Sequence, residues 1–256
     1  FGDPWFSPEQ ANEAKTQVAQ ANALQTRGGK RPLVRRSAPK EGVDSAELAQ
    51  LPRLPDTADE VKSIALALRA ELGSDVFLGD QANERTVKTM DLSKRKIVMF
   101  ATHGLVPGDL NGLTQPALAM SAPAVAGIDG DGLLTMEEIL GLKLNADWVV
   151  LSACNTASGA GAGAEAVSGL GRAFFYAGSR ALMVTHWPVD SRSARLLVSG
   201  VFERYAADAT LSRTEALRRA MIAVMDDAYS DERGRKRYSY AHPMFWAPYA
   251  LVGDSG

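Results

Sequence analysis

The sequence predicts an α/β/α sandwich, with helices on both faces of a mostly parallel central sheet. Three short segments, 97–100, 148–151 and 181–184, are continuously apolar and rich in β-branched residues. Such runs are typical of strands that are buried on both faces, as in a parallel sheet. Helical patterns lie between and after these runs. This alternation of strands and helices favours right-handed crossover connections in an α/β fold.

The helices are predicted from start signals and apolar spacing. Ser7 followed by Pro8 marks the start of a first helix. Thr57–Glu60 is interpreted as a capping box that opens a second. Further helical patterns cover 135–140, 165–176, 191–205 and 211–225. A last apolar segment, 246–252, is interpreted as a closing strand.

Composition excludes several classes of protein. The chain has 28 Lys and Arg against 30 Asp and Glu, so no bulk positive charge favours nucleic acid or an anionic membrane. No apolar run approaches the ~20 residues of a membrane span. One cysteine cannot form an internal disulfide or a Cys-based zinc site. We expect one cytoplasmic domain over residues 1–256, and the start without Met or signal pattern indicates a fragment of a longer protein.

Residues 27–40 differ in composition from the rest of the chain, because they are rich in glycine, proline and basic residues. This pattern predicts an exposed, flexible, basic loop. A docking or cleavage site is the alternative interpretation of the same segment.

Chemically reactive residues follow two of the predicted strands. His103 and Gly104 come shortly after segment 97–100, and Cys154 comes shortly after segment 148–151. Sites in open parallel sheets form beyond the carboxyl ends of the strands. His103 and Cys154 are 51 residues apart, which leaves room for one crossover and a loop. We therefore expect the two strands to be neighbours.

A cysteine beside a histidine suits nucleophilic catalysis. A thiolate is the nucleophile, and an imidazole both favours the thiolate and later protonates the leaving amine. The backbone N–H groups of Gly104 and Cys154 are the predicted oxyanion hole. The alternative is that Cys154 is a small buried hydrophobic residue. His186 and His242 lie next to prolines in predicted turns, where structural or exposed roles are favoured.

Five motifs follow one another from about residue 54 to the end of the chain. They are 100–104, 131–135, 151–156, 187–190 and an ending that comprises 242–243, 246–249 and 251–253. Together they resemble the CHAT domain, a branch of the caspase-like cysteine peptidases related to separase. The resemblance implies a caspase–haemoglobinase fold and a catalytic dyad of His103 and Cys154. Because CHAT domains are commonly joined to helical TPR repeats, it also implies a TPR or other regulatory region as a partner.

The resemblance also bears on substrate preference. Residues 152–156 depart from the Gln-Ala-Cys-Arg-Gly type of signature that caspases carry, so a preference for aspartate is not carried over. Separase-like relatives cut after basic residues, which requires an acid in the specificity pocket. Asp190, in the loop that lines this pocket in the caspase-like plan, is the candidate; its alternative role is the N-cap of the next helix. A basic preference would make 27–40 a self-cleavage site.

Three other motifs have ordinary structural interpretations, which we favour. Residues 161–166 imitate a dinucleotide-binding loop, but about ten residues separate them from the preceding strand. Residues 129–138 imitate part of a calcium loop whose first ligand position is a glycine, so Thr135 and Glu138 are predicted to form a capping box instead. The basic run 233–237 predicts a solvated loop.

The function predicted from the sequence is that of a cysteine endopeptidase. It acts on protein or peptide substrates through an acyl-enzyme, and it requires no metal or organic cofactor. The alternative hypothesis is a non-catalytic, caspase-like scaffold that a helical-repeat region regulates. A nucleotide-binding α/β domain is a third, weaker hypothesis. Neither nucleic acid nor a membrane is an expected partner.

Overall fold

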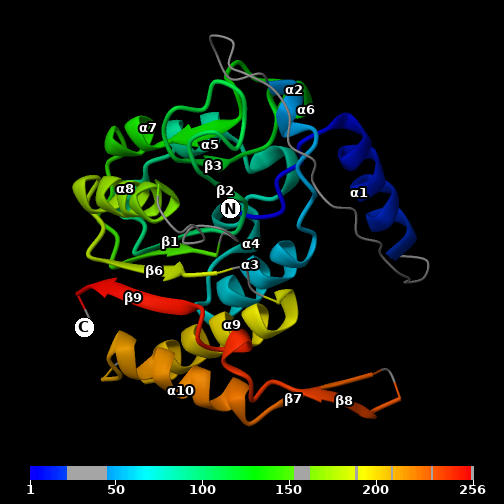
Figure 1. Ribbon diagram of the computed structural model, residues 1–256, viewed down its shortest axis with the longest axis vertical. Coiled ribbons are helices and arrows are strands. Elements are labelled where there is room, and N and C mark those ends of the chain that lie inside the picture. Colours follow the sequence, from blue (N-terminus) through cyan, green and yellow to red (C-terminus); the bar gives the residue numbers. More distant parts are fainter. Residues whose placement is uncertain (22–44, 153–161, 188–189, 209, 232, 255–256) are drawn as a thin grey trace.

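Helices cover both faces of a central sheet in the part of the chain that the structure describes (Figure 1). The computed structural model describes residues 1–21, 45–152, 162–187, 190–208, 210–231 and 233–254. Cys154, the predicted basic loop 27–40 and the first residue of the glycine-rich motif 161–166 lie outside these ranges.

Four strands form the central sheet of the described residues. In spatial order they are β1 (Ile97–Phe100), β5 (Trp148–Leu151), β6 (Ala181–Thr185) and β9 (Tyr249–Gly253). β1 pairs with β5, and β5 with β6, in parallel, whereas β9 pairs antiparallel with β6. The predicted α/β class and the mostly parallel sheet are therefore confirmed. The closing strand begins later than predicted, because the N–H groups of Trp246 and Ala247 bond back to Pro243 in a turn.

Each predicted helix is present near its expected position among the described residues. The α-helices of this part of the chain are α1 (Pro8–Ala21), α2 (Ser45–Leu48), α3 (Asp56–Ala67), α4 (Leu72–Asp75), α5 (Glu84–Thr89), α6 (Pro123–Ala126), α7 (Met136–Leu140), α8 (Ala162–Tyr176), α9 (Ser191–Ala207) and α10 (Arg213–Met225). Four short helices, α2, α4, α5 and α6, were not predicted. Short 3-10 turns are η1 (Gly79–Gln81), η2 (Leu92–Lys94) and η3 (Pro243–Phe245). In Figure 1, α3, α9 and α10 lie on one side of the sheet, and α7 and α8 lie on the other. None of these described helices is long and apolar enough to cross a membrane.

Two small antiparallel units interrupt the α/β pattern. The strands β2 (Gly104–Leu105), β3 (Ala117–Ala119) and β4 (Leu133–Thr135) form a three-stranded sheet, which follows β1 and precedes β5 in the sequence. The strands β7 (Ala228–Ser230) and β8 (Lys236–Ser239) form a hairpin, which follows α10 and precedes β9 in the sequence. Strands of two to four residues leave too short a pattern to be predicted from sequence. The basic run 233–237, predicted as a loop, therefore includes the start of β8, whose side chains are exposed.

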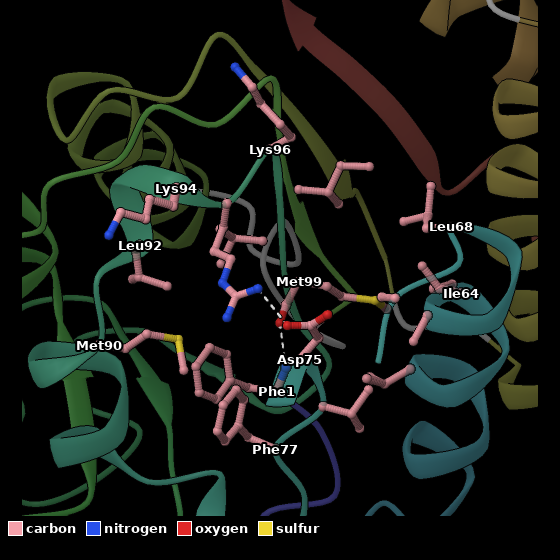
Figure 2. Close-up of a pocket in the computed structure, with 17 residues that line it drawn as sticks. Phe1, Ile64, Leu68, Asp75, Phe77, Met90, Leu92, Lys94, Lys96 and Met99 are labelled. Carbon is pink, nitrogen blue, oxygen red and sulfur yellow. Dashed lines mark hydrogen bonds and ion pairs between the residues drawn. The ribbon is translucent and has the colours of Figure 1, made fainter. Parts of the chain in front are cut away.

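The first residues of the chain extend the sheet beyond β1. Gly2 forms parallel bridges to Ala101 on one side and to Leu78 on the other. The amino group of Phe1 is buried and donates a hydrogen bond of 2.8 Å to the carbonyl oxygen of Met99. Figure 2 shows Phe1 stacked on Phe77 in a mainly apolar pocket between α3 and β1. This arrangement places the segment after Phe1 beside the carboxyl end of β1.

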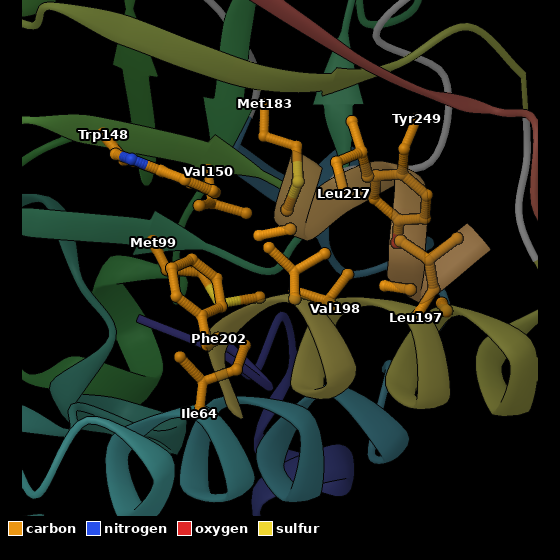
Figure 3. Close-up of a cluster of buried hydrophobic side chains, with 14 of the residues drawn as sticks. Ile64, Met99, Trp148, Val150, Met183, Leu197, Val198, Phe202, Leu217 and Tyr249 are labelled. Atoms are coloured by element: carbon orange, nitrogen blue, oxygen red, sulfur yellow. The ribbon is translucent and has the colours of Figure 1, made fainter. Parts of the chain in front are cut away.

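Residues of the central strands alternate between two hydrophobic cores. Val98, Phe100, Val149 and Leu151 pack under α7 and α8. The residues between them, such as Met99, Trp148 and Val150, pack instead against α3 and α9 (Figure 3). Side chains of a strand point alternately to opposite faces, so a strand covered on both faces must be apolar at every position. This is the physical reason for the continuous apolar runs in the sequence.

The predicted capping box at α3 is wrong. The helix begins at Asp56, with Pro55 as N-cap and no side-chain cap. The hydroxyl of Thr57 donates to the carbonyl oxygen of Leu54 at 2.7 Å and accepts the N–H of Asp3 at 2.8 Å. Thr57 therefore ties the helix start to the first segment of the chain, and Glu60 is left without a capping role.

The second predicted capping box is confirmed. The Thr135 hydroxyl accepts the N–H of Glu138 at 3.3 Å, and a Glu138 carboxylate oxygen accepts the N–H of Thr135 at 2.9 Å. Asp131, in the part that imitates a calcium loop, accepts the N–H of Leu133. In this segment, these side chains organise a turn and the start of α7.

We predict that Phe202→Ala destabilises the fold by about 3–5 kcal/mol. Phe202 is fully buried in α9, and its ring lies 5.0 Å from that of Trp148 in β5, so truncation leaves a cavity at the centre of one core. Denaturant unfolding measures the change. Tyr176→Ala is the matched control, because this aromatic side chain is 82% exposed and its loss should cost less than ~0.5 kcal/mol. Equal destabilisation by both substitutions would contradict the packing.

Candidate active site

The register of the sheet aligns the ends of the two strands that precede the predicted catalytic residues. Phe100, the last residue of β1, pairs with Leu151, the last residue of β5. His103 follows Phe100 by three residues, and Cys154 follows Leu151 by three. Neighbouring strands are about 4.8 Å apart. The expectation that these two strands are neighbours is confirmed, although the placement of Cys154 itself lies outside the described residues.

The contacts of His103 determine which ring nitrogen carries the proton. Its Nε2 lies 2.7 Å from the carbonyl oxygen of Pro52, and its ring packs against Phe6 with a centroid distance of 5.6 Å. A carbonyl oxygen only accepts hydrogen bonds, so Nε2 must be protonated and the neutral ring has its lone pair on Nδ1. Burial lowers the pKa of His103, and the Pro52 carbonyl opposes part of this effect. The neutral form, with Nδ1 as a base, is therefore favoured near neutral pH.

An ion pair supports the segment that holds His103. The Arg53 guanidinium donates to both carboxylate oxygens of Asp3, from Nε at 2.7 Å and from Nη2 at 2.5 Å. Burial raises the pKa of Asp3, and the hydrogen bond and charge of Arg53 act against it. Because Arg53 directly follows Pro52, this bidentate pair fixes the carbonyl group that His103 contacts. It links the start of the chain to the candidate base.

Gly104 directly follows His103 and lies in β2. It is opposite Leu118 of β3, and the hydrogen bond next to this pair runs from the N–H of Ala119 to the carbonyl oxygen of His103. Hydrogen-bonded and non-hydrogen-bonded pairs alternate in antiparallel sheets. The Gly104–Leu118 pair is consequently of the non-hydrogen-bonded kind, in which the N–H of Gly104 points away from β3.

Asp190 caps α9. Its Oδ1 accepts the N–H of Ser193 at 3.0 Å, so the alternative role considered from the sequence is present. His186 is exposed beside Trp187, with its backbone N–H bonded to Pro248. Nδ1 of His242 accepts the N–H of Met244 and caps η3. His242 therefore has the structural role favoured from the sequence, and His186 has the exposed position.

Two pockets lie beside the central sheet, at opposite edges. The apolar pocket of Figure 2, about 360 Å³, is lined by 94–99 at the amino end of β1, opposite to His103. A polar pocket of about 380 Å³ lies between the first turns of α3 and α9, with Asp59 and Arg192 among its lining residues. α9 begins where β6 ends, so this second pocket is at the same edge as His103. Among the described residues, no group of three metal-ligating side chains converges.

Comparison with known families identifies this arrangement. The family model of the CHAT domain matches residues 6–254, nearly the whole chain. The chain belongs to the CHAT domain family. That family is related to the caspase-like cysteine peptidases, and the mostly parallel sheet with helices on both faces is consistent with their fold.

Curated relatives of this CHAT domain are repeat proteins. Tetratricopeptide repeat protein 28 of Mus musculus is 29% identical over 122 residues, and that of Homo sapiens is 28% identical over 122 residues. Each match covers 48% of this chain and 4% of the relative. The chain thus matches only a small part of these much longer proteins.

Glu60 is a residue of this edge that the sequence interpretation assigned wrongly. It lies in α3, is 3% exposed, and its Oε1 has no hydrogen-bond partner among the described residues. Burial raises the pKa of the Glu60 carboxyl to about 7. The signal was present in the helical spacing, because Glu60 precedes Ile64 by one turn and so falls on the apolar face.

We predict that Glu60→Gln makes the CHAT domain more stable at high pH. The native carboxyl keeps its proton up to about pH 7, whereas in the unfolded chain its pKa is near 4.5. Between these values the native state binds more protons, so the free energy of unfolding falls as the pH rises. The fall amounts to about 3 kcal/mol, and the Gln variant lacks it.

Urea unfolding of both proteins across this pH window measures the effect. The stability difference between the variant and the wild type should grow from acid to alkaline pH. A difference that is independent of pH would contradict the assigned ionisation of Glu60.

Proposed function

We propose that this CHAT domain is a cysteine endopeptidase whose nucleophile is Cys154 and whose general base and acid is His103. The observation that carries the proposal is the pairing of β1 with β5, whose paired final residues precede His103 and Cys154 by the same three residues. Family membership supports it, because the family is related to caspase-like cysteine peptidases. An active site at the carboxyl edge of a parallel sheet is the common location in such folds.

The proposed reaction uses the thiol, the imidazole and two backbone N–H groups. Nδ1 of His103 accepts the proton of the Cys154 thiol, and Sγ forms a bond to the substrate carbonyl carbon. The N–H groups of Gly104 and Cys154 stabilise the oxyanion of the tetrahedral intermediate. When this collapses, the C–N bond breaks and His103 returns the proton to the leaving amine. Water, activated by the same imidazole, then hydrolyses the acyl-enzyme and regenerates the thiol.

The contact between His103 and Pro52 supports this assignment of roles. Because Nε2 is held by a carbonyl group, the ring is oriented and its Nδ1 is the basic atom. The lowered pKa of His103 keeps that atom unprotonated near neutral pH. The orientation of the Gly104 N–H away from β3 leaves it available to an oxyanion.

The biological setting of the proposed peptidase follows from its relatives and its cysteine. The curated relatives are tetratricopeptide repeat proteins by name, so we propose a region of helical repeats as regulatory partner. A catalytic thiol must stay reduced, which suits the cytoplasm. If activity depends on the repeat region, the isolated domain is a regulated module. An unreactive Cys154 thiol would instead favour the alternative of a non-catalytic scaffold.

We predict that Cys154→Ala abolishes peptide cleavage and that His103→Ala lowers it by roughly 10²–10⁴-fold, the usual contribution of a general base. His242→Ala is the matched control, because this exposed histidine caps η3 away from the proposed reaction. Cleavage of a peptide library, followed by mass spectrometry, measures all three variants. Cleavage by Cys154→Ala at the wild-type rate would contradict the proposed nucleophile.

We also propose that cleavage follows basic residues and that Asp190 receives their side chains. Asp190→Asn separates this role from helix capping, since asparagine caps as well as aspartate but carries no charge. The variant should unfold at the wild-type denaturant concentration, while kcat/KM for Arg and Lys substrates falls roughly tenfold or more relative to neutral ones. Unchanged selectivity would leave Asp190 as a cap only.

The segment 27–40 tests the same preference for basic residues. Intact-mass analysis of the wild type beside Cys154→Ala reveals whether the chain cleaves itself there.

A further inference from the structure

The polar pocket between α3 and α9 has no part in the proposed reaction, and its two helical walls carry opposite charges. Asp56 and Asp59 lie one turn apart at the start of α3. Arg192 and Arg195 lie one turn apart at the start of α9. All four side chains are exposed, and none of them forms an ion pair with another described residue. The pocket of about 380 Å³ therefore separates two acids from two bases, which are left available to a ligand.

Helix stability does not explain the charged residue at the start of α9. The first turn of a helix carries a partial positive charge, so acids are favoured there and bases are disfavoured. Asp56 and Asp59 follow this preference in α3, whereas Arg192 in the first turn of α9 opposes it. The Arg192 guanidinium lies 4.1 Å from the centre of the Tyr229 ring. Stacking fixes the plane of a guanidinium group and leaves the N–H groups around its edge available to an anion.

The edge of β7 forms a third side of the pocket. Ala228, Tyr229 and Ser230 all line it, and no residue of β8 does. Consecutive side chains of a strand point to opposite faces, so a pocket that contacts three residues in a row borders the edge of the strand. Among the described residues, β7 pairs only with β8, so its other edge has no neighbouring strand. An edge of this kind is a template for another extended chain.

The hydrogen bonds of the hairpin show which backbone group this edge offers. The N–H of Tyr240 donates to the carbonyl oxygen of Asp227 at 3.0 Å. The next pair along the hairpin is Ala228 with Ser239. Because hydrogen-bonded and non-hydrogen-bonded pairs alternate, the carbonyl group of Ala228 points away from β8. Its N–H donates to the Asp227 carboxylate at 2.7 Å. The edge of β7 thus offers an acceptor to a backbone N–H of a bound chain.

We propose that this groove is a docking site for an extended peptide segment of a partner protein that carries an acidic and a basic side chain. The backbone of the segment pairs with the edge of β7. Its acidic side chain binds Arg192 and Arg195, and its basic side chain binds the acids of α3. A segment with charges of one sign places some of them against a wall of the same sign. The groove is therefore selective for mixed charge.

Binding of synthetic peptides to the whole chain tests the proposal. The probes are fluorescein-labelled octapeptides of serine and threonine that contain one Glu and one Lys at every separation, beside octapeptides with two Glu, two Lys or neither. The chain carries Cys154→Ala, which keeps the probes intact if the domain is a peptidase. In fluorescence anisotropy, the best Glu–Lys peptide should bind roughly tenfold more tightly than the other three kinds, and added salt should weaken its binding.

Substitution of the arginine wall should reverse the charge preference, which a loss of folding does not imitate. Arg192→Glu with Arg195→Glu makes both walls acidic. This double variant should bind the Glu–Lys peptide roughly tenfold more weakly and should prefer the two-Lys peptide. Arg218→Glu with Arg219→Glu is the matched control, because these exposed arginines of α10 do not line the pocket. The control should keep the preference for the Glu–Lys peptide.

Two results would overturn the proposal. The first is that no Glu–Lys peptide binds more tightly than the peptides of uniform charge, and the second is that the Arg192 and Arg195 double variant keeps the original preference. Without peptide binding, self-association in analytical ultracentrifugation that the same double variant abolishes would assign the groove to a second copy of the chain. Binding is measured without cleavage, so failure of the proposed peptidase activity leaves the docking site intact.

Discussion

The parallel pairing of β1 with β5, buried on both faces, is the constraint on which the rest of this structure depends. Helices on each side require every residue of these strands to be apolar, and the alternation of side chains then assigns each residue to one of two cores. Polar residues appear only where the strands end. The same register that fills the cores also brings the ends of β1 and β5, the strands that precede His103 and Cys154 in the chain, to one edge.

Two buried acids lie near that edge, and their surroundings differ. Asp3 is neutralised by a bidentate contact with Arg53, and this pair fixes the chain beside His103. Glu60 is buried on the inward face of α3, and no ion pair involves it among the described residues. The paired acid is a structural tie between chain segments. The unpaired acid has an ionisation that responds to pH near neutrality, next to the strand that leads to the candidate nucleophile.

Family membership and geometry supply different parts of the functional argument. The match over residues 6–254 establishes the CHAT family, and the curated relatives share only a small part of their length with this chain. Neither of these findings assigns a reaction. The basicity of Nδ1 in His103, the direction of the Gly104 N–H and the shared strand edge are what support a thiol peptidase.

The sequence by itself determined the fold class, the three parallel strands, the main helices and the residues of the proposed dyad. These are encoded locally, in runs of apolar residues, in helical spacing and in short motifs at strand ends. It misassigned Thr57, whose partner Asp3 is distant in the chain, and Glu60, which is buried only because α3 packs against the sheet. Only the tertiary structure decided that Thr57 binds the first segment, that Pro52 orients His103 and that Glu60 lies beneath β5. Each of these contacts joins groups from separate elements, and burial and hydrogen bonding between such groups exist only once the sheet and its helices have packed.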